Sequence, residues 1–190
     1  MNETSPCGII RMIHQCTFLL DTNCINARQK DQYINQLEKW NRDNVIDLMM
    51  AETSSDEAAV GNKMREKKSC EYLSTLSYVT TLEEQSQLNR IQEILFPSGA
   101  KDQNQKNDVD IVFNALKYDR TLVTMDGDSK SQPGGILGNA KQLNTEFKIK
   151  IVRPEKAVEI VKKAIALRDN TTKQDCDRVG AEYPSWVGKD

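Results

Sequence analysis

Histidine is almost absent from this chain, because His14 is the only one among 190 residues. Zinc sites commonly combine histidine with cysteine at short spacing, and a Ser-His-Asp triad needs a histidine held within a built site. A lone histidine in a polar N-terminal segment fits neither arrangement. We therefore interpret His14 as an ordinary surface residue and expect neither zinc chemistry nor a catalytic triad.

Paired cysteine motifs are also missing. The chain has an odd number of cysteines and no Cys-x-x-Cys motif: Cys7, Cys16, Cys24, Cys70 and Cys176. This pattern does not form a disulfide framework, and residues 1–15 lack the apolar core of a signal peptide. We expect reduced thiols and a cytoplasmic protein. Cys24 is interpreted as a helix-packing residue and not as a nucleophile.

Long apolar runs and a strong charge of one sign are absent as well. No stretch approaches the roughly 18 apolar residues of a spanning helix, so we expect no membrane segment. The net charge of −2 argues against a wholly basic nucleic-acid binder. A local basic rim is compatible with this net charge. A length of 190 residues is enough for one domain with a well-formed core.

What the chain does have is acids at the ends of apolar segments. Asp21 directly follows the apolar run 16–20, as a buried parallel strand would deliver a carboxylate to the carboxyl edge of a sheet. Three further acid positions follow similar stretches: Glu52, Asp108 or Asp110, and Asp126 or Asp128. Four carboxylates in one pocket would repel each other unless a divalent cation held them. The pattern therefore predicts a hard-metal site.

Apolar periodicity predicts alternating strands and helices. We expect strands at 16–20, 45–50, 121–124 and 149–152, and helices at 24–39, 54–73, 83–96, 108–118 and 154–168. Residues 97–107 are interpreted as a polar, flexible loop. This order predicts an α/β fold, a three-layer α/β/α sandwich on a mainly parallel twisted sheet.

The domain organisation follows from the same pattern. We expect a polar N-terminal arm at 1–15, one domain at 16–168 and a polar C-terminal tail at 169–190. Tyr183, Trp186 and Val187 indicate that the end of this tail docks on the domain.

At this point the residues resemble the PIN-domain nucleases. The resemblance covers roughly residues 16–152. Its most specific part is an acid at a helix start followed by isoleucine, Ala-Leu and a strand that ends in acid: Asp108, Ile111, Ala115-Leu116 and Leu122-Val123-Thr124-Met125-Asp126. The resemblance implies a PIN-like fold and a metal-dependent endoribonuclease that cleaves single-stranded RNA.

The same resemblance implies roles for individual residues. Asp21, Glu52, Asp108 and Asp126 would hold one or two Mg²⁺ or Mn²⁺ ions, with Asp110 and Asp128 as spare acids that leave the register open. Thr22, Asn23 and Thr124 would shape the pocket. The resemblance also leaves an antitoxin protein, as in toxin–antitoxin pairs, and a second copy of the chain open as partners.

Phosphodiester hydrolysis suits these residues independently of the family. Two hard cations can activate a water and stabilise the leaving oxygen, so no nucleophilic Ser, Cys or His is needed. A nuclease also needs cations for the phosphates. Basic residues cluster at 63–68, but we favour Lys101 and Lys106 as RNA contacts, because their segment leads into Asp108.

Simpler interpretations stand beside these. An acid at a strand end is often a helix cap or turn residue, and Glu52 can serve only to offset its helix dipole, with Glu57 as a competitor for its role. Asp110 is interpreted as a solvated helix-face charge and Asp128 as a turn residue. The first rival function is a catalytically inactive PIN-like binding or scaffold protein.

The second rival is a haloacid-dehalogenase-like phosphatase. Asp21 and the Asp126-Gly127-Asp128 turn resemble that family, which uses an aspartyl nucleophile. It also needs a second aspartate two residues after the first, where this chain has Asn23.

Overall fold

The computed structural model describes residues 10–25, 28–60, 63–127 and 134–190. Within these residues, five parallel strands form one sheet in the order β3-β2-β1-β4-β5. The strands are β1 (Thr17–Leu20), β2 (Asp47–Ala51), β3 (Leu73–Thr75), β4 (Thr121–Val123) and β5 (Ile151–Val152). The predicted α/β fold with a parallel sheet is confirmed.

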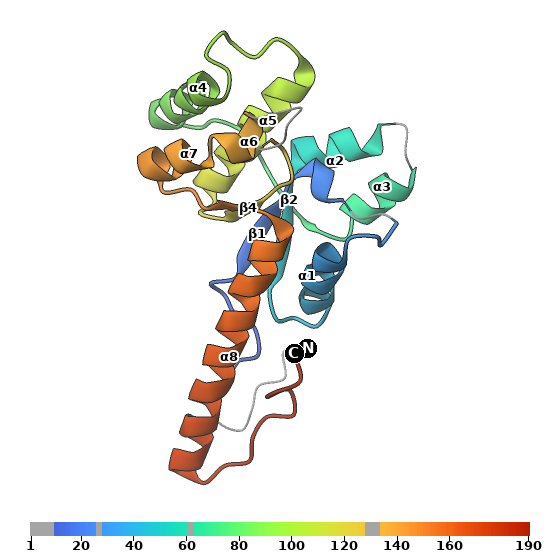
Figure 1. The fold of residues 1–190 in the computed structure, drawn as a ribbon, viewed down its shortest axis with the longest axis vertical. Helices are drawn as coiled ribbons and strands as arrows, with labels where there is room; N and C mark the ends of the chain where they lie inside the picture. The colour runs from blue at the N-terminus through green and yellow to red at the C-terminus, as the bar shows by residue number, and fades with distance from the viewer. Residues whose placement is uncertain (1–9, 26–27, 61–62, 128–133) are drawn as a thin grey trace.

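Helices connect and cover these strands (Figure 1). They are η1 (Thr22–Cys24, a single 3₁₀ turn), α1 (Gln32–Arg42), α2 (Glu52–Ala59), α3 (Lys63–Ser69), α4 (Leu82–Leu95), α5 (Gln103–Lys117), α6 (Gly135–Gly138), α7 (Ala140–Phe147) and α8 (Pro154–Val179). Among the helices of the described residues, none has the length and apolar character needed to cross a membrane.

The sheet separates two hydrophobic cores, which makes the fold three-layered. Successive side chains of a strand point to opposite faces. Accordingly, Phe18 and Leu20 pack with α1 and α8 on one face, whereas Leu19 packs with α4 and α5 on the other. All three side chains are almost fully buried, as expected for a parallel sheet covered on both sides.

The strand order places β1 at the centre of the sheet, where the winding reverses direction. From β1 the chain proceeds through β2 to β3 on one side, and β4 and β5 are added on the other. The carboxyl ends of β1 and β4 therefore flank the switch point at which open α/β sheets bind their ligands.

Helix α5 begins at Gln103, so the prediction of a flexible loop through residue 107 was wrong. The Asp102 side chain accepts a hydrogen bond from the Gln105 backbone amide at 2.9 Å and caps the helix. The first turn has no apolar stripe because residues 101–104 face solvent. A polar helix start was therefore interpreted as a loop.

The predicted helices at 24–39 and 54–73 were also wrong in their extent. Helix α1 begins only at Gln32, because Asp31 caps the backbone amides of Tyr33 and Ile34, each at 2.9 Å. The second segment divides into α2 and α3 and is followed by the edge strand β3, which was not predicted. A three-residue strand with two exposed side chains is too short to show a period. The short helices α6 and α7 were likewise missed.

Helix α8 ends at Val179, eleven residues beyond the predicted end at 168. Its buried face continues through Ile165, Asp169, Thr172 and Cys176 at helical spacing, and Gly180 ends the helix at φ 66°. Three of these four residues are not aliphatic, which concealed the stripe in the sequence. Figure 1 shows α8 extending well beyond the sheet, with the following segment running back beside it.

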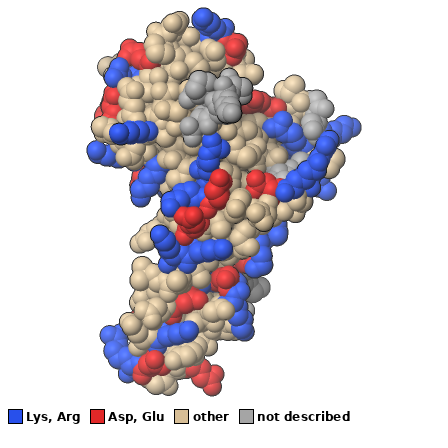
Figure 2. Space-filling model, in the orientation of Figure 1, with Lys and Arg blue, Asp and Glu red and all other residues tan. Residues whose placement is uncertain are grey.

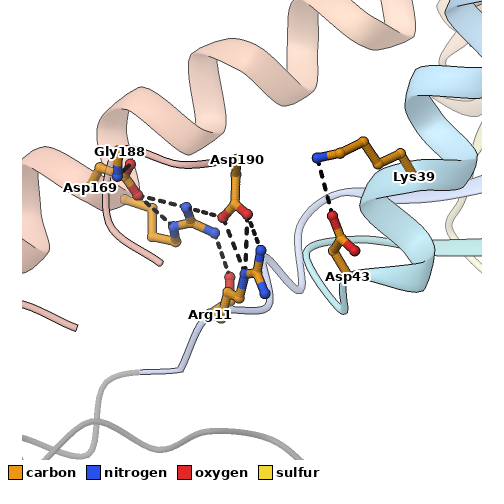
Figure 3. Close-up of polar contacts among 7 residues, drawn as sticks. Arg11, Lys39, Asp43, Asp169, Gly188 and Asp190 are labelled. Carbon is orange, nitrogen blue, oxygen red and sulfur yellow. Dashed lines mark hydrogen bonds and ion pairs between the residues drawn. The ribbon is translucent and has the colours of Figure 1, made fainter. Parts of the chain in front are cut away.

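Residues 10–16 and the C-terminal segment are both fastened to α8 (Figure 3). The Asp190 carboxylate accepts hydrogen bonds from the guanidinium groups of Arg11 and Arg168, the latter at 2.7 Å. Arg168 also donates to the Arg11 carbonyl at 2.7 Å. These three residues, which we name the α8 clasp, join Arg11 to two residues that lie more than 150 positions further along the chain.

The predicted docking of the tail is confirmed for Trp186. Its side chain is 3% exposed, and the guanidinium of Arg168 lies 4.4 Å from the ring centroid. The Gly188 amide donates to Asp169 at 2.8 Å. Tyr183, in contrast, is half exposed and donates its hydroxyl to Asp177.

Candidate carboxylate site

Asp21 lies immediately beyond β1 and is only 4% exposed. Its backbone is extended, and its amide donates to the Val123 carbonyl at 3.0 Å, which fixes it to β4. The Oδ2 atom accepts hydrogen bonds from the Thr124 hydroxyl at 2.5 Å and from the Asn23 amide at 2.7 Å. The carboxylate is thus buried in a defined orientation at the switch point.

Thr124 and Asn23 connect the ends of β1 and β4. The Thr124 hydroxyl, fully buried, donates to Asp21 and accepts from the Asp126 amide at 2.9 Å. Asn23 donates to Asp21 and accepts from the Met125 amide at 3.0 Å. Both side chains therefore orient acids and neighbouring backbone.

Asp126 is positioned from the other side by the start of α6. Its Oδ2 accepts from the Ile136 amide at 2.9 Å, and its carbonyl accepts from the Leu137 amide at 3.0 Å. Gly135, at φ 67°, makes this approach possible, because a Cβ atom there would lie 2.5 Å from Asp126 Oδ2. Gly127 is equally constrained, since a Cβ atom would lie 2.1 Å from the Gly134 oxygen.

Asp108 reaches the same region from the second turn of α5. Burial, followed by the negative charges of Asp126, Asp21 and Glu57 in that order, raises the pKa of its carboxyl from 3.8 to about 8. Burial likewise raises the pKa of Asp21 to about 6, against the opposing effect of the Thr124 hydrogen bond. Asp126 and Glu57 add to the Asp21 shift. Four carboxylates therefore share one poorly solvated region.

Glu57, and not Glu52, supplies the fourth of these charges. Glu52 is the exposed first residue of α2. Glu57 lies further along the helix, where its Oε2 accepts from the Thr22 hydroxyl at 2.8 Å. Ser54 and Ala58, both fully buried, mark the packed face of α2. These two small residues at i and i+4 mark the face of α2 that packs against the molecule, and Glu57 lies beside that face.

The spare acids lie apart from this group or outside the description. Asp110 accepts a hydrogen bond from the Thr53 hydroxyl at 2.7 Å and so links α5 to α2. Asp128 lies outside the described residues. The charges that raise the pKa of Asp21 and Asp108 come from the other acids.

Basic residues approach the site from one side. Lys101 and Lys106 are exposed at the start of α5. Arg65 of α3 contacts the residue after Asp21, because its guanidinium donates to the Thr22 carbonyl at 2.9 Å. Its neighbour Lys68 is instead buried against Glu38 at 2.9 Å. Figure 2 shows Lys and Arg side chains interspersed with Asp and Glu over the face in view.

The cysteine near the acids has no nucleophilic character. The Cys24 side chain is 1% exposed, and its thiol lies 3.4 Å from the Val123 carbonyl. Burial holds the pKa of this thiol well above its ordinary value, and the charges of Asp21 and Asp31 add to the effect. Cys24 is therefore a neutral packing residue.

The donor set fits a hard divalent cation in its chemistry. Carboxylate oxygens are the preferred ligands of Mg²⁺, and a bound cation would offset the burial and the mutual repulsion that raise the pKa values of Asp21 and Asp108. Among the described residues, no group of three or more His, Cys, Asp or Glu side chains is arranged so that it could hold an ion. Mg²⁺ usually keeps several waters and takes only one or two carboxylates, which is compatible with that spacing.

No protein-family model and no curated protein matches the chain. Among solved structures it is similar to a chain in the crystal structure of VapBC2 from Rickettsia felis bound to a DNA fragment from their promoter. The TM-score is 0.45 at 15% identity, over 72% of this chain and 98% of that chain. This likeness does not establish a family, and the function proposed below rests on the carboxylate site.

Proposed function

We propose that the protein is a metal-dependent endoribonuclease that hydrolyses phosphodiester bonds of single-stranded RNA. The observation that carries the proposal is the convergence of Asp21, Glu57, Asp108 and Asp126 at the switch point of the sheet, where burial and the charges of the neighbouring acids raise the pKa values of Asp21 and Asp108. Such repulsion is costly in a structural site but suits a site that binds cations. The likeness of residues 16–152 to PIN-domain nucleases agrees with it.

In this proposal Asp21, Glu57, Asp108 and Asp126 would hold Mg²⁺ or Mn²⁺ through one or two carboxylates per ion, and the bound metal would supply an activated water and stabilise charge on the leaving oxygen. Asn23 and Thr124 keep the Asp21 carboxylate oriented through their hydrogen bonds of 2.7 and 2.5 Å. Thr22 orients Glu57, and Arg65 supplies positive charge for the phosphates beside it. Lys101 and Lys106, near the start of α5, would contact the RNA strand at a neighbouring position.

The biological setting is proposed from the resemblance alone. We propose a cytoplasmic enzyme that acts as the toxin of a toxin–antitoxin pair, with an antitoxin protein as its inhibitor and a homodimer as a candidate assembly. Co-expression with the product of a neighbouring gene, followed by co-purification, tests the antitoxin partner. Light scattering of the purified chain tests the dimer.

The activity is tested with a mixed-sequence single-stranded RNA in Mn²⁺ buffer and in EDTA. Cleavage should require the metal, and Asp21→Asn should abolish it without lowering the melting temperature in EDTA, because one of several crowded charges is removed. Asp110→Asn is the matched control, since Asp110 bonds to Thr53 instead. Cleavage that persists in EDTA would disprove the metal mechanism.

The rival interpretation as a non-catalytic binding protein has one observation in its favour. Among the described residues, no three acids are arranged so that they could hold an ion. If neither RNA nor DNA is cleaved with Mn²⁺ and no Mn²⁺ binds, that interpretation replaces ours. The phosphatase interpretation loses support, because Asn23 is a hydrogen-bond donor to Asp21 and an amide cannot act as the general acid.

A further inference from the structure

A cavity of about 470 Å³ adjoins the carboxylate site between α2, α3 and the start of α5. Glu57 belongs to both places: it lines this cavity and also accepts the Thr22 hydroxyl next to Asp21. Arg65 lines it from α3. The volume lies in the range of small-molecule pockets. An RNA strand with one phosphate at the acids would therefore have its adjoining nucleotide beside this cavity.

We propose that this cavity binds an unstacked nucleobase of the RNA strand, next to the phosphate that the acids engage. The inference rests on the proposed nuclease function for the identity of its ligand. Proteins recognise single-stranded RNA by accommodating splayed-out bases and by hydrogen bonding to their edges. A cavity beside a phosphate site offers the place for one such base.

The wall contributed by α5 consists of neutral amides. Gln103, Asn104 and Asn107 line the cavity, and Gln103 Nε2 donates to Asn107 Oδ1 at 2.9 Å. This bond occupies the side-chain oxygen of Asn107, which is only 8% exposed. Asparagine and glutamine offer a donor and an acceptor together, which suits base edges better than phosphates.

The wall contributed by α2 accepts hydrogen bonds. Asp56 lies on it with an exposed carboxylate, beside Glu57. Carboxylates accept from exocyclic amino groups, as in the contact of an acid with cytosine N4. Adenine, cytosine and guanine carry such a group, whereas uracil does not. The cavity should therefore favour an amino-bearing base over uracil.

Arg65 lies where the backbone of the bound strand would pass. Its guanidinium donates to the carbonyl of Thr22, the residue after Asp21, at 2.9 Å, and its side chain also lines the cavity. A guanidinium between the acids and the cavity can bind the phosphate that links the nucleotide in the cavity to the nucleotide at the cleavage site.

The test is nucleotide binding in EDTA, which needs no cleavage. AMP, CMP and UMP are titrated into the ¹⁵N-labelled protein while the side-chain amide signals are followed by NMR. AMP and CMP should shift the signals of Gln103, Asn104 and Asn107. UMP should bind about threefold to tenfold more weakly, the equivalent of one hydrogen bond.

Variants sharpen the assignment. Asn104→Ala removes an exposed amide of the cavity wall and should weaken AMP binding about threefold to tenfold. Gln142→Ala, an exposed amide on α7, is the control and should leave binding unchanged. The melting temperature of both variants verifies folding.

Two results would overturn the inference. One is the absence of cavity shifts with every nucleotide, and the other is UMP binding as tightly as AMP with no effect of Asn104→Ala. Arginine amide is titrated as well. If it shifts the cavity signals and the nucleotides do not, the cavity is assigned to a basic peptide. RNA cleavage without nucleotide binding would support the nuclease function and contradict the base site. Nucleotide binding without RNA cleavage would support the base site and contradict the nuclease function.

Discussion

At the residue scale, the Thr124 hydroxyl has the widest influence on the site. It donates to the buried Asp21 carboxylate at 2.5 Å and accepts the Asp126 amide at 2.9 Å. It was identified in the sequence only through the Leu-Val-Thr-x-Asp pattern that resembles the PIN-domain nucleases. Its hydrogen bonds to both acids could not be predicted without the register of β1 against β4.

Thr124→Val should destabilise the protein by about 1–3 kcal/mol, because a buried carboxylate and a backbone amide each lose a partner at nearly constant volume. Urea denaturation in EDTA measures the change. Thr145→Val is the control, since that hydroxyl is exposed and donates only to the Lys141 carbonyl. Equal losses in both variants would mean that Thr124 does not support the acids.

Asp108 should make the metal-free protein less stable as the pH rises. Its pKa is raised from 3.8 to about 8, so the folded state holds a proton that the unfolded state releases. Stability is therefore lost progressively from about pH 4 to pH 8 and no further above it. Asp108→Asn removes this dependence and should be the more stable form in EDTA, by a margin that grows towards pH 8.

Chemical denaturation at pH 5, 6.5 and 8 measures that margin. Asp110→Asn is the matched control on the same helix, and its effect on stability should not vary with pH in this range, because the amide keeps an oxygen that can accept from Thr53. A margin for Asp108→Asn that is constant with pH would contradict the raised pKa.

At the element scale, strand ends were predictable and helix phases were not. Asp21 stands directly after β1 and Asp126 three positions after β4, so their places at the sheet edge followed from the strands alone. The choice of Glu57 over Glu52 depended on where α2 starts and which face it packs. The sequence shows neither the start of α2 nor its packed face, because the eight residues of this helix are only weakly amphipathic and follow β2 without a break.

The tight approach of α6 to Asp126 should make Gly135 irreplaceable. Gly135→Ala combines a positive φ with a contact of 2.5 Å to Asp126 Oδ2, whereas Gly99→Ala, at φ 82°, meets nothing within 4 Å. Gly99→Ala should cost only the strain of about 1–2 kcal/mol. Gly135→Ala should cost more and should also reduce Mn²⁺-dependent cleavage, because Asp126 must move.

Thermal unfolding and the RNA assay together test that pair of variants. If Gly99→Ala and Gly135→Ala lose the same stability and neither loses activity, the packing of α6 on Asp126 is not required for the site.

At the scale of the whole molecule, the three-layer fold was predicted but the extent of α8 was not. The parallel sheet follows from alternating apolar segments, which depend on local sequence. The length of α8 depends on contacts with residues 10–16 and 181–190, among them the α8 clasp. Such contacts join distant parts of the chain and leave no periodic trace.

Asp190→Asn should lower the stability by about 1–3 kcal/mol, because two guanidinium groups lose their charged acceptor. Burial opposes ionisation of Asp190, but Arg11 and Arg168 outweigh it and hold its pKa below the ordinary value. The contribution is therefore present above the unfolded pKa and is lost as the pH falls through the folded one.

Asp43→Asn provides the control, because Asp43 pairs with Lys39 at 3.2 Å in a solvent-exposed position (Figure 3). Such surface pairs contribute about 0–1 kcal/mol. Melting curves at pH 7 should thus separate the two variants. Equal melting temperatures would show that the α8 clasp does not hold the ends of the molecule in place.

The most direct measurement of the central claim is calorimetric titration of Mn²⁺ into the wild type, Glu57→Gln and Glu52→Gln. The account predicts that the wild type binds Mn²⁺, that Glu57→Gln binds it about tenfold to hundredfold more weakly, and that Glu52→Gln binds it as the wild type does. No binding to the wild type, or a loss with Glu52→Gln and not with Glu57→Gln, would contradict the assignment of these four carboxylates as a divalent-cation site.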